Sequence, residues 1–376
     1  MLFYFFFFLN MTSYKFLFLI FKNKISQQNN IINSIIESFP VQAGKQERRK
    51  EDMDDIGELL LRRCPPSKVV GYFEKDGLLE PYHAETKLYE TLVNEIKPLN
   101  SDYFKRVLKE FTDLLDRTAG NIPEATYETW EWVYEEYVTT LGVAHSPKET
   151  DIIMYKFNDG CKVNIAERPR VIGQGSTGNR TWEASVYLVH YLLAHPELVP
   201  DAKARDSTRV IELGAGTGVV SFAYQQLFPF EQQLVVTDGD EDIARRTLPR
   251  NCSLNDISPG VDISIERLVW GQDPRTHHQH HQDYDYDLIL GSDLTYDDRI
   301  LEPLCTALEG LLTARNHAVI AATVRNPTTT ALFEKTIRLH NLRYTVMPPH
   351  AEVDSACETT LFKRITTPIS IYKIFI

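Results

Sequence analysis

Three glycines at alternate positions, Gly214, Gly216 and Gly218, have a spacing that suits the binding of a small molecule. They directly follow a short apolar run that ends at Leu213, and a segment of helical period begins at Val219. This order predicts a buried strand that turns through a glycine loop into a helix, where the backbone can approach a nucleotide-like ligand closely. The dinucleotide-binding pattern G-x-G-x-x-G requires glycine at position 219, which is valine here. A nicotinamide site and a plain tight turn remain as alternatives.

Two acidic residues flank this loop. Glu212 precedes it, and a carboxylate there suits a ligand with an ammonium group better than one with a pyrophosphate. Asp238 lies twenty residues beyond Gly218, at the end of a second apolar run. An acidic side chain in that place can accept hydrogen bonds from both hydroxyls of a ribose. The alternative is a helix cap, for which Asp240 is better placed than Asp238.

Polar and aromatic residues also follow the next two apolar runs. The indole ring of Trp270 can lie against an adenine, a contact of roughly 1–3 kcal/mol by analogy with base stacking, or it can fill the core. Beyond Ser292, Asp293 and Tyr296 can orient a lysine amine by a charge-assisted hydrogen bond and a ring contact. Asp293 could instead anchor a turn at the end of its strand.

Alternating strands and helices must position these side chains. Apolar runs predict strands at about 210–213, 234–237, 263–268, 288–291 and 318–322, and closing strands at 344–346 and 369–375. Helical periodicity falls between them at about 218–227, 240–251, 300–312 and 328–340, after an earlier helix at 181–193. Asn158-Asp159-Gly160 predicts a hairpin turn between 151–157 and 162–167. The pattern predicts a Rossmann-like, doubly wound α/β fold with a parallel seven-strand sheet, whose ligand lies at the carboxyl ends of the early strands.

Two further regions precede this predicted domain, which covers residues 143–376. Residues 54–142 carry amphipathic helical patterns at 86–96 and 104–115, so we expect a small helical domain. Residues 1–53 form an apolar and then polar extension that lacks the basic start and the cleavage site of a signal peptide. Lys15 interrupts it as a membrane span, and Met53 begins an acidic segment typical of a cytosolic amino terminus. We expect this extension to be disordered, or mispredicted with the true start at Met53 and therefore dispensable, with membrane targeting as the alternative.

The composition narrows the class of protein. The net charge of −12 over 376 residues, without a dense basic stripe, argues against a protein that binds nucleic acid through its phosphates. Five scattered cysteines without a C-x-x-C pair indicate reduced, intracellular thiols. The run from His277 to His281 invites a metal site, but adjacent histidines lack the spacing of zinc ligands. We expect a solvated insertion there and no metal.

The motifs resemble those of known methyltransferases. The E-L-G-x-G-x-G pattern at residues 212–218 resembles the S-adenosylmethionine loop of class I methyltransferases. Residues 293–296 fit the D-x-x-Y motif that follows the fourth strand in the seven-strand lysine methyltransferases, also called methyltransferase family 16. Residues 176–185 resemble the S-T-G-x-x-T-W-E-A segment of the elongation factor 2 lysine methyltransferases. Those proteins also have a helical amino-terminal domain with R-x-x-P-P near its start, similar to residues 62–66, so the resemblance spans about residues 54–376.

This resemblance implies an S-adenosylmethionine-dependent protein-lysine N-methyltransferase that modifies elongation factor 2. Asp293 and Tyr296 would then be catalytic, with Asp293 as an orienting acceptor. The implied cofactor-binding residues are Trp182, Glu212, Gly214, Ala215, Gly216, Gly218, Asp238, Trp270 and Ser292. We expect a cytoplasmic monomer whose helical domain recognises the substrate, with neither a nucleic-acid partner nor a stable membrane association. The alternatives are a methyltransferase for another protein lysine or a small molecule, a nicotinamide-dependent oxidoreductase, and a non-enzymatic binding module.

Overall fold

The computed structural model describes residues 56–75, 86, 88–118, 128–142, 150–158, 160–168, 178–200, 208–228, 232–271 and 286–376. The chain divides into two units, Met1–Gly57 and Glu58–Ile376, and the second contains nearly all of these residues. The expectations for residues 1–53, for the Ser-Thr pair at 176–177 and for His277–His281 lie outside the described residues. Among those that are described, no helix is both long and apolar enough to cross a membrane.

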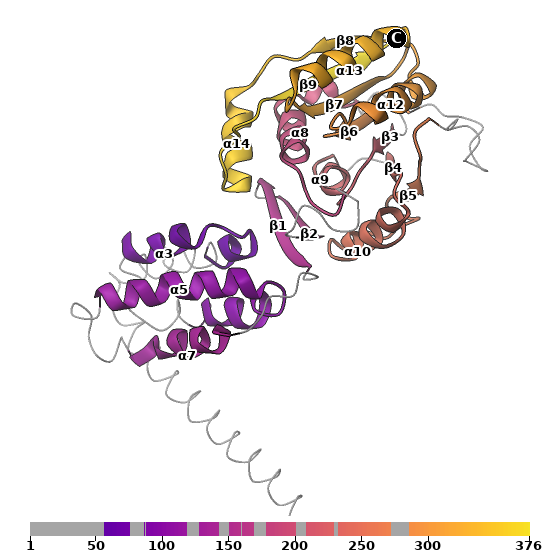
Figure 1. The fold of residues 1–376 in the computed structure, drawn as a ribbon. Coiled ribbons are helices and arrows are strands. Elements are labelled where there is room, and N and C mark those ends of the chain that lie inside the picture. Colours follow the sequence, from indigo (N-terminus) through magenta and orange to yellow (C-terminus); the bar gives the residue numbers. More distant parts are fainter. Residues whose placement is uncertain are drawn as a thin grey trace, which may run out of the picture. The chain divides into compact units, whose positions relative to one another are not determined.

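The described residues of the segment predicted to be helical form several helices (Figure 1). They include α3 (Pro66–Lys75), η1 (Glu90–Ile96), α5 (Ser101–Thr118) and α7 (Glu131–Thr140). The periodicity predicted at 104–115 lies within α5, whose buried face includes Phe104, Val107 and Phe111. The ring of Phe111 meets that of Phe73 edge-on at 4.9 Å and stacks on Trp130 at 5.9 Å. This cluster gives the segment its own apolar core.

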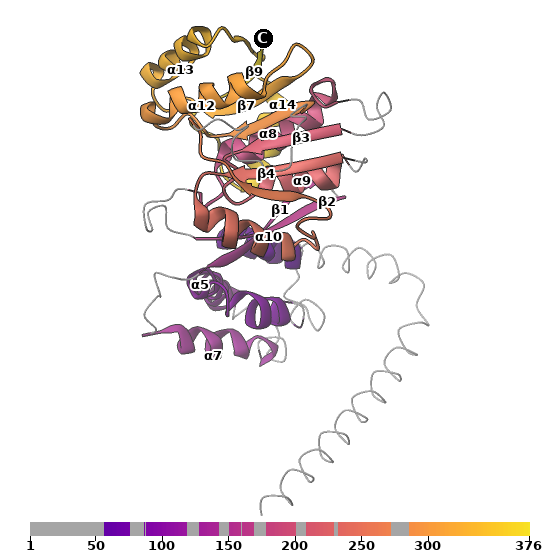
Figure 2. The same ribbon diagram turned by 90° about the vertical axis from the view of Figure 1, so that its right-hand side faces the viewer.

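The hairpin expected around Asn158 is present. Strands β1 (Asp151–Asn158) and β2 (Cys161–Glu167) pair antiparallel. The side chain of Asn158 accepts a hydrogen bond from the backbone N–H of Gly160 at 2.9 Å, which closes the turn locally. The hairpin lies near helices α9 and α10 and contacts both through β2 (Figure 2).

The seven-strand α/β sheet confirms the predicted fold class. Its strands run in the order β5-β4-β3-β6-β7-β9-β8. Their bounds are Thr208–Leu213 for β3, Gln232–Asp238 for β4, Ser264–Arg267 for β5, Leu288–Ser292 for β6, His317–Thr323 for β7, Arg343–Val346 for β8 and Ile369–Phe375 for β9. The first five in this order are parallel, whereas β9 is antiparallel to both β7 and β8. The expectation of a fully parallel sheet was therefore wrong at this edge.

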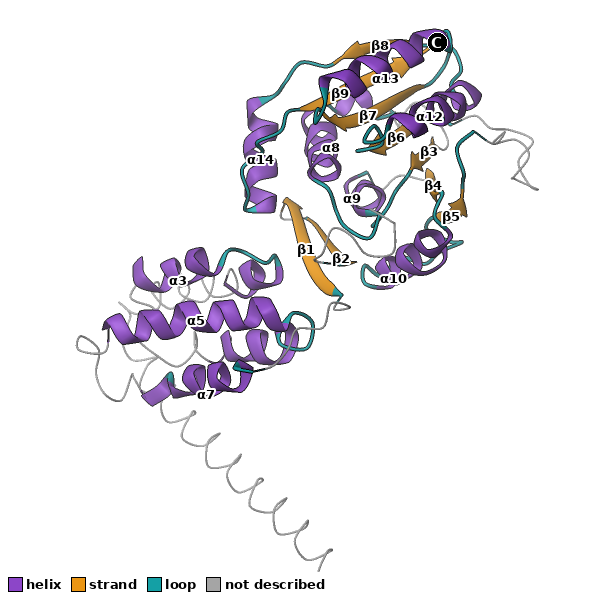
Figure 3. Cartoon of the chain, in the orientation of Figure 1, coloured by secondary structure: helices purple, strands orange, loops and turns teal. Residues whose placement is uncertain are grey.

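Helices cover both faces of the sheet, as predicted (Figure 3). One face packs against α8 (Glu183–Ala194), α9 (Val219–Leu227) and α10 (Leu248–Ser253), and the other against α12 (Asp298–Leu311) and α13 (Pro327–Leu339). Alternate residues of a strand point to opposite faces of the sheet. In β6, Leu288 and Leu290 pack in the core on the α8 face, and Ile289 packs in the core on the α12 face. A strand buried on both sides needs a continuous apolar run, which is why these strands were evident in the sequence.

Two helical features differ from the expected pattern. The helix expected at 240–251 contains a π-helical stretch, η4 (Ile243–Thr247), directly before α10. Pro249 lies at the start of α10 and has no N–H to donate, so the helix changes its hydrogen-bonding pattern there. The second feature is α14 (Ala351–Leu361), which was not predicted and packs against α8 and β1. The short 3₁₀ helix η2 (Pro196–Leu198) follows α8.

Candidate functional site

The residues singled out in the sequence lie at or just beyond one edge of the sheet, where the parallel strands end. Leu213 of β3 pairs with Gly291 of β6, and Ser292 pairs with Ala321 of β7. Asp238, the last residue of β4, pairs with Arg267 of β5. The carboxyl ends of β3, β4, β5, β6 and β7 are therefore neighbours, which is where doubly wound folds bind their ligands.

The glycine loop between β3 and α9 requires its glycines for conformational and for packing reasons. Gly214, Gly216 and Gly218 have φ angles of 59°, 55° and 85°. A Cβ on Gly216 would lie 3.1 Å from the carbonyl oxygen of Gly178, and one on Gly218 would lie 2.6 Å from the ring of Phe222. The missing side chains thus make room for neighbouring parts of this chain, in addition to any ligand.

Leu294 joins the glycine loop to the D-x-x-Y segment. A Cβ on Gly214 would lie 2.7 Å from Leu294, and a Cβ on Gly291 would lie 2.6 Å from the same side chain. Leu294 is 3% exposed, so it fills a space that exists because both neighbours are glycine. Its packing fixes Asp293 relative to the loop after β3. Sequence reasoning missed this role, since nothing in the sequence marks which apolar side chain occupies the gap.

Glu212 lies inside the interface between the sheet and α9. Its Oε2 accepts hydrogen bonds from both the backbone N–H (3.0 Å) and the hydroxyl of Ser221. Because Ser221 is the third residue of α9, the carboxyl group satisfies an N–H at the helix start that has no partner within the helix. Burial raises the pKa of Glu212 to about 8, against the opposing effect of the Ser221 hydrogen bonds. Its binding of a cofactor ammonium group stays a prediction.

Asp238 ties the glycine loop to the end of β4. Its Oδ2 accepts from the N–H of Gly216 and its Oδ1 from the N–H of Asp240, each at 2.9 Å. Burial raises the pKa of this carboxyl group above its ordinary value. Asp240 in turn accepts from the N–H of Asp242 at 2.8 Å, which is the capping role expected for it. Asp238 is therefore not needed as a cap, and it remains partly exposed at the strand edge.

Trp270 lies against the loop from the side of β5. Its indole carbons would come within 3.1 Å of a Cβ on Gly214, so the ring packs directly over that glycine. The indole ring also packs against the core on the α12 face. Its N–H is buried without a hydrogen-bond partner among the described residues. Both the adenine contact and the core position that the sequence allowed are compatible with this placement.

Asp293 has a strained backbone and a partner that was not foreseen. Its φ of 54° lies in the left-handed region, and its N–H donates to the carbonyl of Ala321 at 2.7 Å. Arg325, just beyond β7, donates from Nη1 to Oδ1 at 2.8 Å and from Nη2 to Oδ2 at 2.6 Å. The Asp293 side chain is 6% exposed. Residues held in such conformations cluster at functional sites.

The aromatic residues of the site differ in exposure. Tyr296 is 55% exposed, so its ring is accessible to a large substrate. Trp182 directly precedes α8 and is partly buried. The guanidinium carbon of Arg325 lies 5.2 Å from the centre of the Trp182 ring, and that of Arg180 lies 5.7 Å from it. Trp182 and Asp293 thus both contact Arg325.

Ser292 connects the end of β6 to α8. Its hydroxyl group lies 2.8 Å from that of Ser185, one turn into the helix that Trp182 precedes. Ala215, the remaining predicted loop residue, donates its N–H to the carbonyl of Thr237 in β4 at 2.9 Å. Each contact joins neighbouring elements at the strand edge. Cofactor binding by these two residues stays a prediction.

The predicted cofactor, S-adenosylmethionine, fits the groups at this edge. The Asp238 carboxylate accepts backbone N–H groups, among them those of Gly216 and Asp240, at 2.9 Å each. A carboxylate has about four acceptor positions, so it can also accept from a ribose hydroxyl. In the described part of the chain, Oε1 of Glu212 and the indole N–H of Trp270 are buried without partners. Buried polar groups of this kind are rare unless water or a ligand satisfies them. The described residues contain no group of three or more side chains able to hold a metal ion.

A hollow of about 370 Å³ lies away from these residues, beside α10 and the end of β2. Arg168, Arg246 and Arg250 contribute positive charge to it, and Glu167 and Asp242 contribute carboxyl groups. Because the two signs are mixed, charge alone does not define a ligand there. None of the residues predicted to bind the cofactor lines it.

Comparison with known proteins gives one family for the chain. Residues 161–338 match the family model described as lysine methyltransferase. The chain is 32% identical over 340 residues to protein-lysine N-methyltransferase EFM3 of Saccharomyces cerevisiae, covering 84% of this chain and 96% of that protein. It is 26% identical over 239 residues to human protein-lysine N-methyltransferase EEF2KMT, covering 60% and 68%. A solved SAM-dependent methyltransferase from Aquifex aeolicus is 10% identical with a TM-score of 0.36, covering 52% and 93%.

Proposed function

Because this chain belongs to the family of protein-lysine N-methyltransferases and uses S-adenosylmethionine as its methyl donor, we propose that its substrate is a lysine of elongation factor 2. The alternatives of a nicotinamide-dependent oxidoreductase and of a binding module without activity do not hold for a member of this family. The choice among protein substrates is the part that is proposed.

The proposed elongation factor 2 substrate rests on two sequence segments, and the extent of the likeness to the yeast relative supports a role for residues outside the family model. That alignment covers 84% of the chain, whereas the match to the family model spans residues 161–338, which is less than half of it. The likeness therefore includes residues outside the matched part of the methyltransferase domain. The Thr-Trp-Glu segment at 181–183 and the Arg-Arg-Cys-Pro-Pro segment at 62–66 resemble those of the elongation factor 2 lysine methyltransferases. We therefore assign residues 54–142 to recognition of the protein substrate and 143–376 to methyl transfer.

The cofactor is assigned to the edge formed by β3, β4 and β5. Asp238 would accept hydrogen bonds from the ribose hydroxyls with the acceptor positions that the backbone leaves free. Trp270 would lie against the adenine. Oε1 of Glu212, which has no partner among the described residues, would face the ammonium group, whose positive charge would favour the ionised carboxylate. The loop from Gly214 to Gly218 would approach the cofactor with its backbone, with Trp182 and Ser292 completing the site from α8 and β6.

Asp293 and Tyr296 are assigned to the target lysine. The reaction is an in-line displacement, so the main task of the protein is to align the amine with the methyl group and the sulfur. The carboxylate of Asp293 would accept a hydrogen bond from the amine, and the exposed ring of Tyr296 would contact the lysine side chain. Since a nearby carboxylate favours the protonated lysine, Asp293 would act as an orienting acceptor rather than as a general base.

The test of this proposal is methylation in a cell lysate. The protein would be incubated with labelled S-adenosylmethionine and the lysate, and the labelled band would be identified by mass spectrometry. A methylated lysine in elongation factor 2 is the expected result, and purified elongation factor 2 should then accept the label directly. Labelling of a different protein, with elongation factor 2 unlabelled, would move the proposal to another protein lysine.

A further inference from the structure

Arg325 and Asp293 form an ion pair with two hydrogen bonds at the proposed lysine site. The two bonds measure 2.8 and 2.6 Å, and each joins a different guanidinium nitrogen to a different carboxylate oxygen. This parallel geometry fixes the plane of the carboxylate as well as its position. The guanidinium group also lies 5.2 Å from the centre of the Trp182 ring, so it is held from two sides. The pair forms because β6 and β7 are adjacent, although the residues are 32 positions apart.

A lone carboxylate at this place would work against methyl transfer. Only the neutral amine of lysine has the electron pair that attacks the methyl carbon. An opposite charge within about 4–6 Å favours the ammonium form, which raises the pKa of the lysine. The Asp293 side chain is almost completely buried, and Coulomb interactions are stronger away from water. An orienting carboxylate therefore needs a compensating positive charge.

We propose that Arg325 is a positioning residue that fixes the Asp293 carboxylate and offsets its charge, so that the target lysine is bound as the neutral amine. The inference rests on the proposed function, which places the lysine at Asp293. Each oxygen of Asp293 accepts one hydrogen bond from Arg325, so acceptor positions remain for the amine. The amine loses its proton to solvent and then forms the carbon–nitrogen bond as the carbon–sulfur bond breaks, with that electron pair staying on sulfur.

Of the charged groups near this pair, Arg325 is the one whose contact with the Asp293 carboxylate the structure describes. Glu183, in the first turn of α8, is paired with Lys363, so these two charges offset each other. Arg180 lies near the Trp182 ring and is a second cation at the site, 5.7 Å from the ring centre. The hydrogen bonds to Asp293 raise the pKa of Arg325 above its ordinary value, with a smaller contribution from Glu183. Arg325 thus stays charged at every pH at which the enzyme can be assayed.

The test is the pH dependence of methylation by Arg325→Gln relative to the unchanged enzyme. In the enzyme–substrate complex, the profile of kcat reports the ionisation of the bound lysine. If loss of the guanidinium raises the lysine pKa by about one unit, kcat falls roughly tenfold at pH 7 and recovers to within about twofold at pH 10. Arg325→Lys keeps the positive charge and loses the two-bond geometry, so its loss should be the same at every pH. Arg338→Gln removes a guanidinium near the other end of α13 and is the matched control.

Purified elongation factor 2 and total lysate protein serve as parallel substrates. If the unchanged enzyme labels only other lysate proteins, the proposed substrate is wrong, yet the ratio of variant to unchanged enzyme still tests Arg325. A pH-independent loss in Arg325→Gln, or a faster rate at pH 7, would overturn the inference. Melting temperature and S-adenosylhomocysteine binding report whether each variant folds. Should Arg325→Gln not fold, Asp293→Asn provides the second test, because leaving Arg325 unopposed should shift the kcat profile toward lower pH.

Discussion

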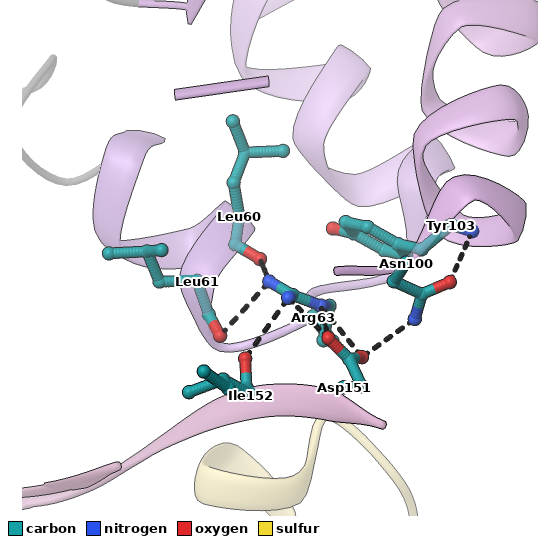
Figure 4. A network of polar contacts seen from close by, with 7 residues as sticks. All are labelled: Leu60, Leu61, Arg63, Asn100, Tyr103, Asp151 and Ile152. Atoms are coloured by element: carbon teal, nitrogen blue, oxygen red, sulfur yellow. Dashed lines mark hydrogen bonds and ion pairs between the residues drawn. The ribbon is translucent and has the colours of Figure 1, made fainter. Parts of the chain in front are cut away.

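The guanidinium group of Arg63 and the carboxylate of Asp151 form a buried ion pair between the helical segment and the start of β1 (Figure 4). Nε of Arg63 donates to Oδ2 of Asp151 at 2.9 Å, and Nη2 donates to Oδ1 and to the carbonyl of Ile152. Nη1 donates to the carbonyls of Leu60 and Leu61. All three guanidinium nitrogens thus have partners. The two side chains are 8% and 3% exposed, so the pair is shielded from water.

Arg63→Ala should destabilise the protein by about 3–5 kcal/mol, because it leaves the buried carboxylate of Asp151 without its counter-charge. Asn100, which donates to Asp151 at 2.6 Å, is a neutral partner and cannot replace the arginine. Urea unfolding would measure the change. The matched control is Arg106→Ala, whose pair with Asp102 is 59% and 55% exposed and should contribute less than about 1 kcal/mol. Equal losses in the two variants would show that burial does not govern the strength of the Arg63 pair.

The same pair bears on substrate recognition if the helical segment binds the protein substrate. Asp151→Asn keeps the shape of the side chain but removes the charge that holds Arg63, so the segment should be held less firmly. We expect kcat/KM for elongation factor 2 to fall by about tenfold or more, as misplacement of a substrate costs about 10²-fold. S-adenosylhomocysteine affinity should stay within about twofold, since Asp151 is not part of the strand edge. A parallel loss of cofactor affinity would indicate general unfolding.

Asp238→Ala should weaken cofactor binding while Asp240→Ala should not. Calorimetric titration should give a micromolar affinity for S-adenosylhomocysteine, roughly −8 kcal/mol. Loss of the Asp238 carboxylate should reduce this by about 1–3 kcal/mol, because the ribose loses a charged acceptor. Asp240 caps the following helix through Asp242 and serves as the neighbouring control. Binding of NADH without a response to S-adenosylhomocysteine would contradict the assignment of this edge.

The central strands could be predicted from the sequence because a strand that is buried on both faces appears as a continuous run of apolar residues. In β3, Val210, Ile211 and Leu213 are apolar on both faces of the strand, and the glycine loop marks its end. An apolar run does not indicate whether its strand is parallel or antiparallel to its neighbours. An apolar run such as β9 has the same composition whether it is parallel or antiparallel, and its direction here follows from the path of the chain through α14.

Features that depend on distant contacts were not predictable. Arg325 lies between Val324 and Asn326 in a stretch without a recognisable motif, and only the pairing of β6 with β7 brings it to Asp293. The helix α14 buries three residues, Val353, Cys357 and Thr360, which is too weak a pattern to identify a helix. Asp293 itself could be identified because the end of a strand and the D-x-x-Y spacing are local properties of the sequence. Its pairing with Arg325 and its positive φ depend on the folded structure, so the sequence did not indicate them.

Glu212→Gln should change how stability depends on pH. Burial raises the pKa of the folded-state carboxyl group to about 8 from its ordinary value of 4.5. The folded protein therefore retains a proton that the unfolded chain releases, and the contribution to stability is full below pH 4.5 and lost as the pH rises through about 8. The slope in this window should approach 1.4 kcal/mol per pH unit. The amide cannot ionise, so the variant should lose less stability between pH 5.5 and 8, as measured by urea unfolding. Parallel stability profiles of the two proteins would show that Glu212 is already ionised when folded.

Substitution of Asp293 should reduce catalysis much more than cofactor binding. Asp293→Ala should lower the methylation rate by about 10²-fold or more, because the amine loses the acceptor that aligns it. Alanine is disfavoured at the φ of 54°, whereas asparagine adopts this conformation more readily. Asp293→Asn also keeps one acceptor oxygen, so its loss of rate should be smaller than that of the alanine variant. S-adenosylhomocysteine affinity should stay within a few-fold in both, as Asp238 lies on a different strand.

Tyr296→Phe separates the ring from its hydroxyl group at the same site. The Tyr296 side chain is 55% exposed, and the described contacts give its hydroxyl no hydrogen-bond partner. If the ring supplies the contact to the lysine, the phenylalanine variant should lose less than about tenfold in rate. Tyr296→Ala should lose more, because only the alanine variant removes the ring. Rates on elongation factor 2 at saturating cofactor would measure both changes. Full activity of Asp293→Ala and of Asp293→Asn would move the reacting site away from the end of β6, because the alignment argument places the amine at that carboxylate.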